Sequence, residues 1–214
     1  MTTPVLQPSS SSIPLRRDRA ALILIDLQVG HLGAIKTISP EQLTRNVAAL
    51  TQIARLYALP VILTGSKQPP PEGLFLPEVT RHLPDPTVVE RTTSNAWNAP
   101  EFVAAVEATG RRQLVLAGVA LDIGVALPAL SAGYEVAGYE VAVVVDATGA
   151  TDARVETGTL MRLAARGIAL VSWASVGMEL QGDLALPQGR ELMQIIGASF
   201  AQEHDPFRAG GDEQ

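Results

Sequence analysis

Residues 20–26 read AALILID, and this stretch decides the fold. Six apolar residues followed by an acid are typical of a strand buried on both faces of a parallel sheet, because a half-exposed strand alternates apolar and polar residues. Five further short runs of this kind follow, at residues 59–64, 87–91, 113–119, 140–146 and 168–172. The sequence therefore predicts six buried strands.

Helical patterns separate these strands. One helix is expected to begin at Pro40, after the N-cap candidate Ser39, and others over residues 99–109, 121–132, 152–166 and 187–200. Strands that alternate with helices form a parallel sheet with helices on both faces, because the crossovers are right-handed. We therefore expect an α/β fold: a three-layer α/β/α sandwich around a six-stranded, mostly parallel, Rossmann-like sheet.

Length and composition indicate one domain. The chain has 214 residues, of which 47% are hydrophobic, enough for one sizeable core. We expect a disordered leader over residues 1–17, the domain over 18–204 and a polar tail over 205–214. The apolar runs are far shorter than the roughly 20 residues of a membrane span, and no signal peptide is recognised, so the expected location is the cytoplasm.

Charge and cysteine content exclude several classes of function. A net charge of −6 argues against nucleic acid as the partner and says little else about function. The chain has no cysteine, so it has no disulfide, no thiolate metal site and no cysteine nucleophile.

Residues 133–142 read GYEVAGYEVA, a tandem repeat of five residues. The two copies cannot both be the same turn followed by a strand. We expect the first copy to finish the preceding helix and the second to enter the strand, and a duplication tolerated at the surface explains the repeat without a function.

Three features with chemical potential lie at predicted carboxyl ends of strands, where ligands bind in such sheets. Asp26 could move protons there, and Arg91 could pair with it or bind an anionic substrate. The turn at residues 118–124, GVALDIG, runs from a strand into a helix, and backbone amides at such a turn can bind an anion. Each feature also has a structural interpretation: a capping acid, a surface arginine and an ordinary glycine turn.

No metal site or cofactor is expected. The three histidines, His31, His82 and His204, are scattered, and neither an HExxH motif, a GxSxG elbow nor a Walker A sequence is present. His31 follows Asp26 closely and is a candidate pocket residue, although an ordinary loop histidine is the simpler interpretation.

Taken together, these segments resemble the isochorismatase-like (cysteine hydrolase) family over most of the chain. The resemblance is carried by five motifs in register: ALILIDLQ at Asp26, ERTTSNAW at Arg91, AGVALDIGVALPALSA over 117–132, VVVDATGA at Asp146, and MRLAARGIALVSWASVGMEL. The last pieces are most similar to the YcaC-like branch of octameric bacterial hydrolases. This branch implies a homo-oligomer, anything from a dimer to an octamer.

The shared motifs indicate which residues of this chain occupy the family's site positions. The family implies a triad of Asp, Lys and Cys, and here Asp26, Arg91 and Gly124 occupy those three positions. A cis peptide in the preceding turn would be Val119–Ala120, with the amides of Ala120 and Gly124 directed at an oxyanion. His31, Asn95, Trp97 and Leu121 are the candidate substrate-binding residues.

A glycine at position 124 leaves three functions open. The isochorismatase branch proper also has glycine there, and its aspartate protonates a vinyl ether without a protein nucleophile, so Asp26 could act in that way. However, its turn reads GVYAHxG, whereas this chain has GVALDIG. The alternatives are an inactive homologue that binds a small molecule or serves assembly, and a cysteine amidohydrolase whose nucleophile has been replaced. Thr92, Ser94 and Ser131 lie outside the turn and are poor substitutes.

Overall fold

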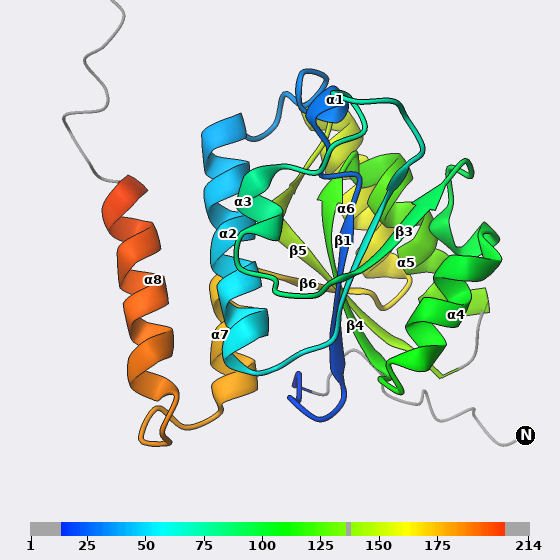
Figure 1. Cartoon of the computed structure of the whole chain (residues 1–214). Coiled ribbons are helices and arrows are strands. Elements are labelled where there is room, and N and C mark those ends of the chain that lie inside the picture. Colours follow the sequence, from blue (N-terminus) through cyan, green and yellow to red (C-terminus); the bar gives the residue numbers. More distant parts are fainter. Residues whose placement is uncertain (1–13, 136–137, 204–214) are drawn as a thin grey trace, which may run out of the picture.

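The computed structural model describes residues 14–135 and 138–203, and it confirms the predicted α/β architecture (Figure 1). Six strands form one sheet in the order β3-β2-β1-β4-β5-β6, and all five pairings are parallel. The order 3-2-1-4-5-6 is that of the Rossmann fold. The strands are β1 Ala20–Ile25, β2 Val61–Ser66, β3 Thr87–Arg91, β4 Gln113–Val119, β5 Glu140–Gly149 and β6 Ala169–Val171.

Strand β1 lies in the centre of the sheet, and all six of its residues are buried. Successive side chains of a strand point to opposite faces, so β1 serves two cores. Leu22 and Leu24 belong to one core, and Ile23 and Ile25 to the other. This explains why the run that decides the fold has no polar position.

Helices cover both faces of the sheet (Figure 1). One core packs beneath α2, α7 and α8, and the other beneath α4, α5 and α6. The α8 helix, orange to red in Figure 1, lies outside α2 and α7. The helices are α1 Val29–Leu32, α2 Pro40–Leu56, α3 Pro77–Thr80, α4 Pro100–Ala108, α5 Ala126–Leu130, α6 Ala153–Ala165, α7 Trp173–Gln181 and α8 Gly189–Glu203.

Local signals placed several helix ends correctly. The Ser39 side chain caps α2 by accepting a hydrogen bond from the backbone N–H of Gln42 at 3.1 Å, and Pro40 is the first helical residue. Gly110 has a φ of +65° just after α4, a conformation that a glycine adopts without strain.

Other element boundaries differ from the prediction. Strand β2 begins and ends two residues later than expected, and β5 continues three residues beyond Asp146. The single helix expected over residues 121–132 is instead a π-helical turn η3 (Leu121–Val125), the short α5, and a second π-helical turn η4 (Ser131–Glu135). Helix α7 was not predicted at all.

The repeat divides as expected at the ends that the structure describes. Gly133 of the first copy lies in η4, and Tyr139 of the second copy is buried immediately before β5. Gly138 takes a φ of +103° at the turn between them. Val136 and Ala137 lie outside the described residues.

The structure tests the predicted limits of the domain only in part. Residues 1–13 and the tail from His204 lie outside the described residues. Residues 14–17 lie against the domain: Leu15 is buried, its N–H donates to Glu179 Oε2 at 2.9 Å, and Arg17 Nε donates to the carbonyl of Leu180 at 2.7 Å. No helix of the described residues is long and apolar enough to cross a membrane.

Candidate functional site

Asp26 follows β1 directly and lies at the carboxyl edge of the sheet. Its φ of +52° is uncommon for a residue other than glycine, although aspartate adopts this region more readily than most residues. The N–H of Asp26 donates to the carbonyl of Thr64 at 2.9 Å, so the residue stays joined to β2 while the chain turns out of the sheet. The residue is 8% exposed.

Both carboxylate oxygens of Asp26 are engaged. Oδ2 accepts a hydrogen bond from Arg91 Nη2 at 2.6 Å, within a buried ion pair. Oδ1 accepts from the backbone N–H of Ser66 at 3.1 Å. The predicted meeting of Asp26 and Arg91 is therefore observed, and Ser66 joins them.

Arg91 is the last residue of β3 and pairs in register with Ser66 of β2. Its Nη1 donates to the carbonyl of Thr93, and its Nε is buried without a hydrogen-bond partner among the described residues. An unsatisfied buried donor is rare in proteins. The Arg91 guanidinium thus retains a donor for a further polar group.

Gly124 lies in η3 and packs against Asp26. A Cβ added to Gly124 would be 2.8 Å from Asp26 Oδ2 and 2.5 Å from the carbonyl oxygen of Val119. The Val119–Ala120 peptide that precedes η3 is cis, as the resemblance implied. Asp26, Arg91 and the turn that contains Gly124 therefore meet at one place, although they are separated in the sequence.

Gly118 makes this arrangement possible. It has a φ of +137°, and a Cβ there would lie 1.9 Å from the carbonyl oxygen of Ile25. Strands β1 and β4 can approach this closely only because residue 118 has no side chain. The turn from β4 into η3 is thereby held beside the end of β1.

A second set of polar side chains lies next to Asp26, and only one of them, His31, was named from the sequence. His31 of α1 has Nε2 2.8 Å from Ser66 Oγ, and Gln68 Nε2 donates to the same hydroxyl at 2.8 Å. Gln28 is fully buried; its Oε1 accepts from the N–H of Ser66 at 3.0 Å and its Nε2 donates to the carbonyl of Gly73 at 2.6 Å. We call Gln28, His31, Ser66 and Gln68 the His31–Ser66 cluster.

Backbone pairing places His31 above the end of β2. The N–H of Leu76 donates to the carbonyl of Leu27, Val29 donates to Leu74, and Gly30 donates to Glu72, each at 3.0 Å. The loop after β2 therefore folds back along the chain that leaves β1. From the sequence, only His31 was named as a candidate pocket residue. Ser66 and Gln68 lie beyond residue 64, where the second strand was expected to end, and no local signal marked them.

The remaining predicted site residues make local contacts. Asn95 Oδ1 accepts from the N–H of Trp97 at 3.0 Å at the start of the short 3₁₀ helix η2 (Ala96–Asn98), and its Nδ2 donates to Ser131 Oγ at 2.9 Å. The Trp97 ring packs edge-on against Phe102 and Tyr139. The role of Asn95 and Trp97 in binding a substrate stays a prediction.

Leu121 is buried and lines a separate pocket of about 290 Å³ beside Asp146. Burial raises the pKa of the Asp146 carboxyl, although its Oδ1 accepts the N–H of Trp173 at 2.8 Å. Within the described ranges, no group of three or more His, Asp or Glu side chains is arranged to hold a metal ion.

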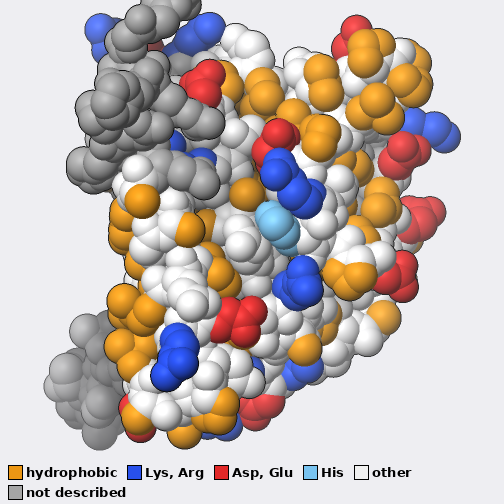
Figure 2. Space-filling model, turned by 60° about the vertical axis from the view of Figure 1, so that its left-hand side comes forward, with side chains coloured by type: hydrophobic (Ala, Val, Ile, Leu, Met, Phe, Trp, Pro, Cys, Tyr) orange, Lys and Arg blue, Asp and Glu red, His pale blue; other side chains and the backbone are white. Residues whose placement is uncertain are grey.

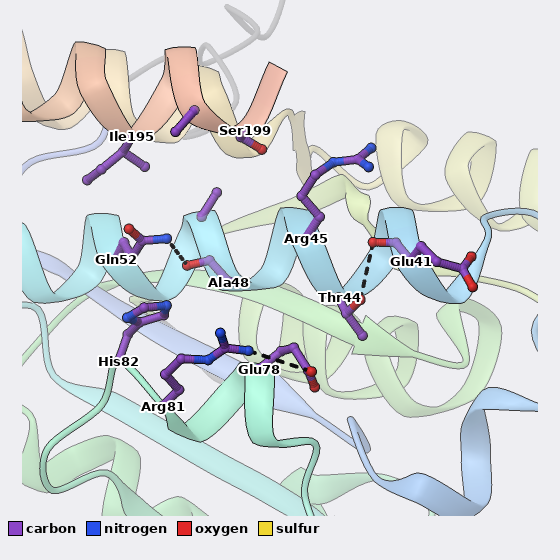
Figure 3. Close-up of a pocket in the computed structure, with 12 residues that line it drawn as sticks. Glu41, Thr44, Arg45, Ala48, Gln52, Glu78, Arg81, His82, Ile195 and Ser199 are labelled. Carbon is purple, nitrogen blue, oxygen red and sulfur yellow. Dashed lines mark hydrogen bonds and ion pairs between the residues drawn. The ribbon is translucent and has the colours of Figure 1, made fainter. Parts of the chain in front are cut away.

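A larger groove of about 470 Å³ lies on another face, between α2, α3 and α8 (Figure 3). Figure 2 shows that basic and acidic side chains and a histidine gather on this face, with hydrophobic side chains around them. In the groove, Arg81 and Glu78 form an exposed pair at 3.6 Å, and Gln52 donates to the carbonyl of Ala48 of its own helix. These two contacts join residues three and four positions apart in the sequence, whereas the buried Asp26–Arg91 pair joins residues 65 positions apart.

Comparison with known proteins identifies the family of this chain. Residues 20–175 match the isochorismatase domain family. The probable hydrolase YcaC of Escherichia coli is 39% identical over 172 residues, which cover 80% of this chain and 82% of the relative. The chain therefore belongs to the isochorismatase family, and it is similar to the YcaC hydrolases.

Two solved structures extend the likeness to the fold. YcaC from Pseudomonas aeruginosa, determined with hexane-2,5-diol and covalent acrylamide, has a TM-score of 0.77 and 38% identity, covering 87% of this chain and 98% of its own. The Escherichia coli YcaC gene product, described as an octameric hydrolase of unknown specificity, has a TM-score of 0.76 and 34% identity, covering 92% and 99%.

Proposed function

We propose that the chain is a hydrolase that acts on a small organic molecule through the proton chemistry of Asp26, without a thiol nucleophile. The observation that carries this proposal is the buried Asp26–Arg91 ion pair with the backbone of Gly124 packed against it. The chain has no cysteine at any position, so a thioester or thioimidate cannot form. A carboxyl group that can exchange a proton with the substrate supports a reaction without a covalent intermediate.

Vinyl-ether hydrolysis is the reaction we favour. Asp26, in its protonated form, would donate its proton to the enol carbon. Water would add to the resulting oxocarbenium carbon and return a proton to the Asp26 carboxylate. The hemiketal would then collapse to a carbonyl compound and an alcohol, its hydroxyl proton passing to the leaving alcohol oxygen. Water supplies the oxygen, so no covalent bond to the protein is needed. The unpaired Nε of Arg91 supports a substrate that brings an oxygen acceptor to the site.

The test is a turnover screen over vinyl ethers, amides and carboxylated small molecules, with wild type, Asp26→Asn and His82→Gln compared. His82 lies on the groove of Figure 3 and serves as the matched control. We expect Asp26→Asn to abolish turnover and His82→Gln to retain it. Equal turnover by wild type and Asp26→Asn would refute the proposal, provided that circular dichroism shows both to be folded.

One observation favours an inactive homologue that binds a small molecule as the second candidate. Both oxygens of Asp26 already accept hydrogen bonds from the protein, as in a carboxylate with a structural role. The same screen separates the candidates: a compound that raises the melting temperature of wild type and of Asp26→Asn equally, and is never turned over, would support binding alone.

We infer that the chain forms a homo-oligomer, anything from a dimer to an octamer, and we keep the cytoplasm as its proposed location. The octameric YcaC relative supports this inference. The α7–α8 region exposes large apolar side chains that a neighbouring copy could cover: Met178, Leu184, Leu186, Met193 and Phe200.

A further inference from the structure

Ser66 carries a hydroxyl group that the Asp26 chemistry does not use. It ends β2 at the ligand edge of the sheet, is half-buried, and lies between Asp26 and His31. Its backbone N–H is shared between Asp26 Oδ1 at 3.1 Å and Gln28 Oε1 at 3.0 Å. The backbone of Ser66 is therefore fixed on both sides, and the hydroxyl is held where His31 can reach it.

The contacts of this hydroxyl are those of an activated nucleophile. Ser66 Oγ lies 2.8 Å from His31 Nε2, within the range in which an imidazole accepts a hydroxyl proton. Gln68 Nε2 donates to Ser66 Oγ at 2.8 Å and so helps to hold this oxygen beside the imidazole.

The His31–Ser66 cluster offers Nε2 of the imidazole a partner both before and after this nitrogen takes a proton. When His31 is neutral with its proton on Nδ1, the Ser66 hydroxyl donates to Nε2. When His31 is protonated, Nε2–H donates to Ser66 Oγ, and the hydroxyl turns to Gln28 Oε1, which lies 3.2 Å away. A base that keeps its hydrogen bonds after taking a proton needs little rearrangement during the reaction.

We propose that Ser66 and His31 form a second reactive centre, in which Ser66 takes the acyl group of a small, uncharged carboxylic ester. Ser66 Oγ bonds to the carbonyl carbon, and its proton passes to His31 Nε2. The bond from this carbon to the alcohol oxygen then breaks, and the alcohol leaves with the proton from His31. Water then attacks the carbonyl carbon of the acyl-serine and gives a proton to His31. The bond from this carbon to Ser66 Oγ breaks, His31 returns the proton to Oγ, and the carboxylic acid leaves.

The substrate class follows from the neighbouring charges. The carboxylate of Asp26 lies beside Ser66, and Arg91 is already paired with it. The Asp26 carboxylate would repel a second anion placed at Ser66, whereas an uncharged ester meets no such cost. This centre does not depend on proton transfer by Asp26, so either proposal can fail without the other.

A fluorophosphonate probe tests this proposal without a known substrate. Attack by Ser66 Oγ forms an O–P bond and expels fluoride, leaving a stable adduct that peptide mass spectrometry locates. We expect one equivalent on Ser66 of wild type, none on Ser66→Ala, and at least a tenfold slower rate for His31→Gln. His82→Gln controls for loss of an imidazole elsewhere, and Ser94→Ala for loss of an exposed serine; both should label as wild type.

Three results would overturn the inference: no adduct on wild type, an adduct at a serine other than Ser66, or labelling of Ser66 at an unchanged rate in His31→Gln. Because Ser66→Ala and His31→Gln remove hydrogen bonds, their melting temperatures are measured in parallel. The wild-type result alone decides whether the Ser66 hydroxyl is reactive, even if a variant fails to fold.

Discussion

Gly124 and Asp26 are in direct contact, with so little space between them that a Cβ on Gly124 would lie 2.8 Å from Asp26 Oδ2. The same Cβ would approach the carbonyl oxygen of Val119 to 2.5 Å. Real Cβ atoms do not come this close, and one of the two neighbours is backbone. In the present conformation of the chain, position 124 therefore has no room for a side chain larger than that of glycine.

The first prediction is that Gly124→Ala destabilises the protein by about 1–3 kcal/mol, the usual cost of overpacking a core. The matched control is Gly158→Ala in α6, where an added Cβ meets nothing within 4 Å. That change should stabilise by up to about 1 kcal/mol, since alanine is the better helix former. Urea denaturation measures both, and equal effects of the two substitutions would contradict the steric argument.

The second prediction concerns a cysteine at the same position. We expect Gly124→Cys to be destabilised at least as much as Gly124→Ala and to gain no thiol-dependent hydrolysis of amides. Acrylamide and iodoacetamide are suitable probes because wild type has no cysteine to react. A folded Gly124→Cys that reacts with these probes and hydrolyses amides would instead support the view that the chain is a cysteine hydrolase with a replaced nucleophile.

The third prediction is strong coupling between Asp26 and Arg91. Removing one partner of a buried pair leaves the other charge uncompensated, which costs about 3–5 kcal/mol. Asp26→Asn and Arg91→Met should each show a loss of this order, and the double variant should lose much less than the sum. A double-mutant cycle from urea denaturation gives the coupling energy, and additive losses would show that the pair does not interact in solution.

The meeting of Asp26 and Arg91 could be predicted because it depends on a general rule. Each residue ends a buried strand, and the carboxyl ends of parallel strands meet at one edge of the sheet. The strand order, which places β2 between β1 and β3 in the structure, was not predicted from the sequence. The resemblance to the family, which puts Asp26 and Arg91 in one triad, completed the prediction that these two residues meet.

Ser66 was missed because the sequence does not fix where β2 ends. The prediction stopped this strand at Thr64, whereas in the structure two further residues pair with Glu90 and Arg91 of β3. The buried side chain of Gln28 packs over Gly65 and binds the Ser66 backbone, which extends the strand. Such a contact between residues 38 positions apart leaves no local pattern.

Helix α7 was missed for a similar reason. Ser172 and Ser175 cap its first turn reciprocally, and Asp146 Oδ1 accepts the N–H of Trp173. Asp146 lies in β5, so one of the hydrogen bonds that stabilise the start of α7 comes from a strand distant in the sequence. Residues 173–181 had no predicted element of their own, between the strand expected to end at residue 172 and the helix expected to begin at 187.

The fourth prediction is that the chain sediments as an oligomer. Leu192 and Ile196 of α8 are buried within the chain, and Phe200 packs against Trp173, so much of this helix docks intramolecularly. Leu186 is 48% exposed in the preceding loop and is free to contact a neighbour. Leu186→Glu should lower the sedimentation coefficient while leaving the fold unchanged, and Thr157→Glu on the exposed face of α6 is the control. A wild-type monomer at micromolar concentration would rule out the oligomer.

The last prediction uses the raised pKa of Asp146. Burial disfavours the charged carboxylate in the folded chain, so the native state binds this proton more tightly than the unfolded state does. The stability from this group is therefore present below about pH 4, the ordinary range of a carboxyl, and is lost as the pH rises through the raised pKa. At pH 7 the buried charge of Asp146 therefore lowers the free energy of unfolding of the wild type.

Asp146→Asn removes that charge and keeps an oxygen that can accept the N–H of Trp173, whereas Asp146→Ala loses this hydrogen bond. We expect Asp146→Asn to gain stability relative to wild type as the pH rises from 4 to 7, and Asp146→Ala to lose about 1–2 kcal/mol near pH 4. Urea denaturation across this range measures both. Glu156 lines the same pocket, so Glu156→Gln is measured in parallel. A difference between Asp146→Asn and wild type that does not change with pH would show that the charge of Asp146 costs the folded protein nothing.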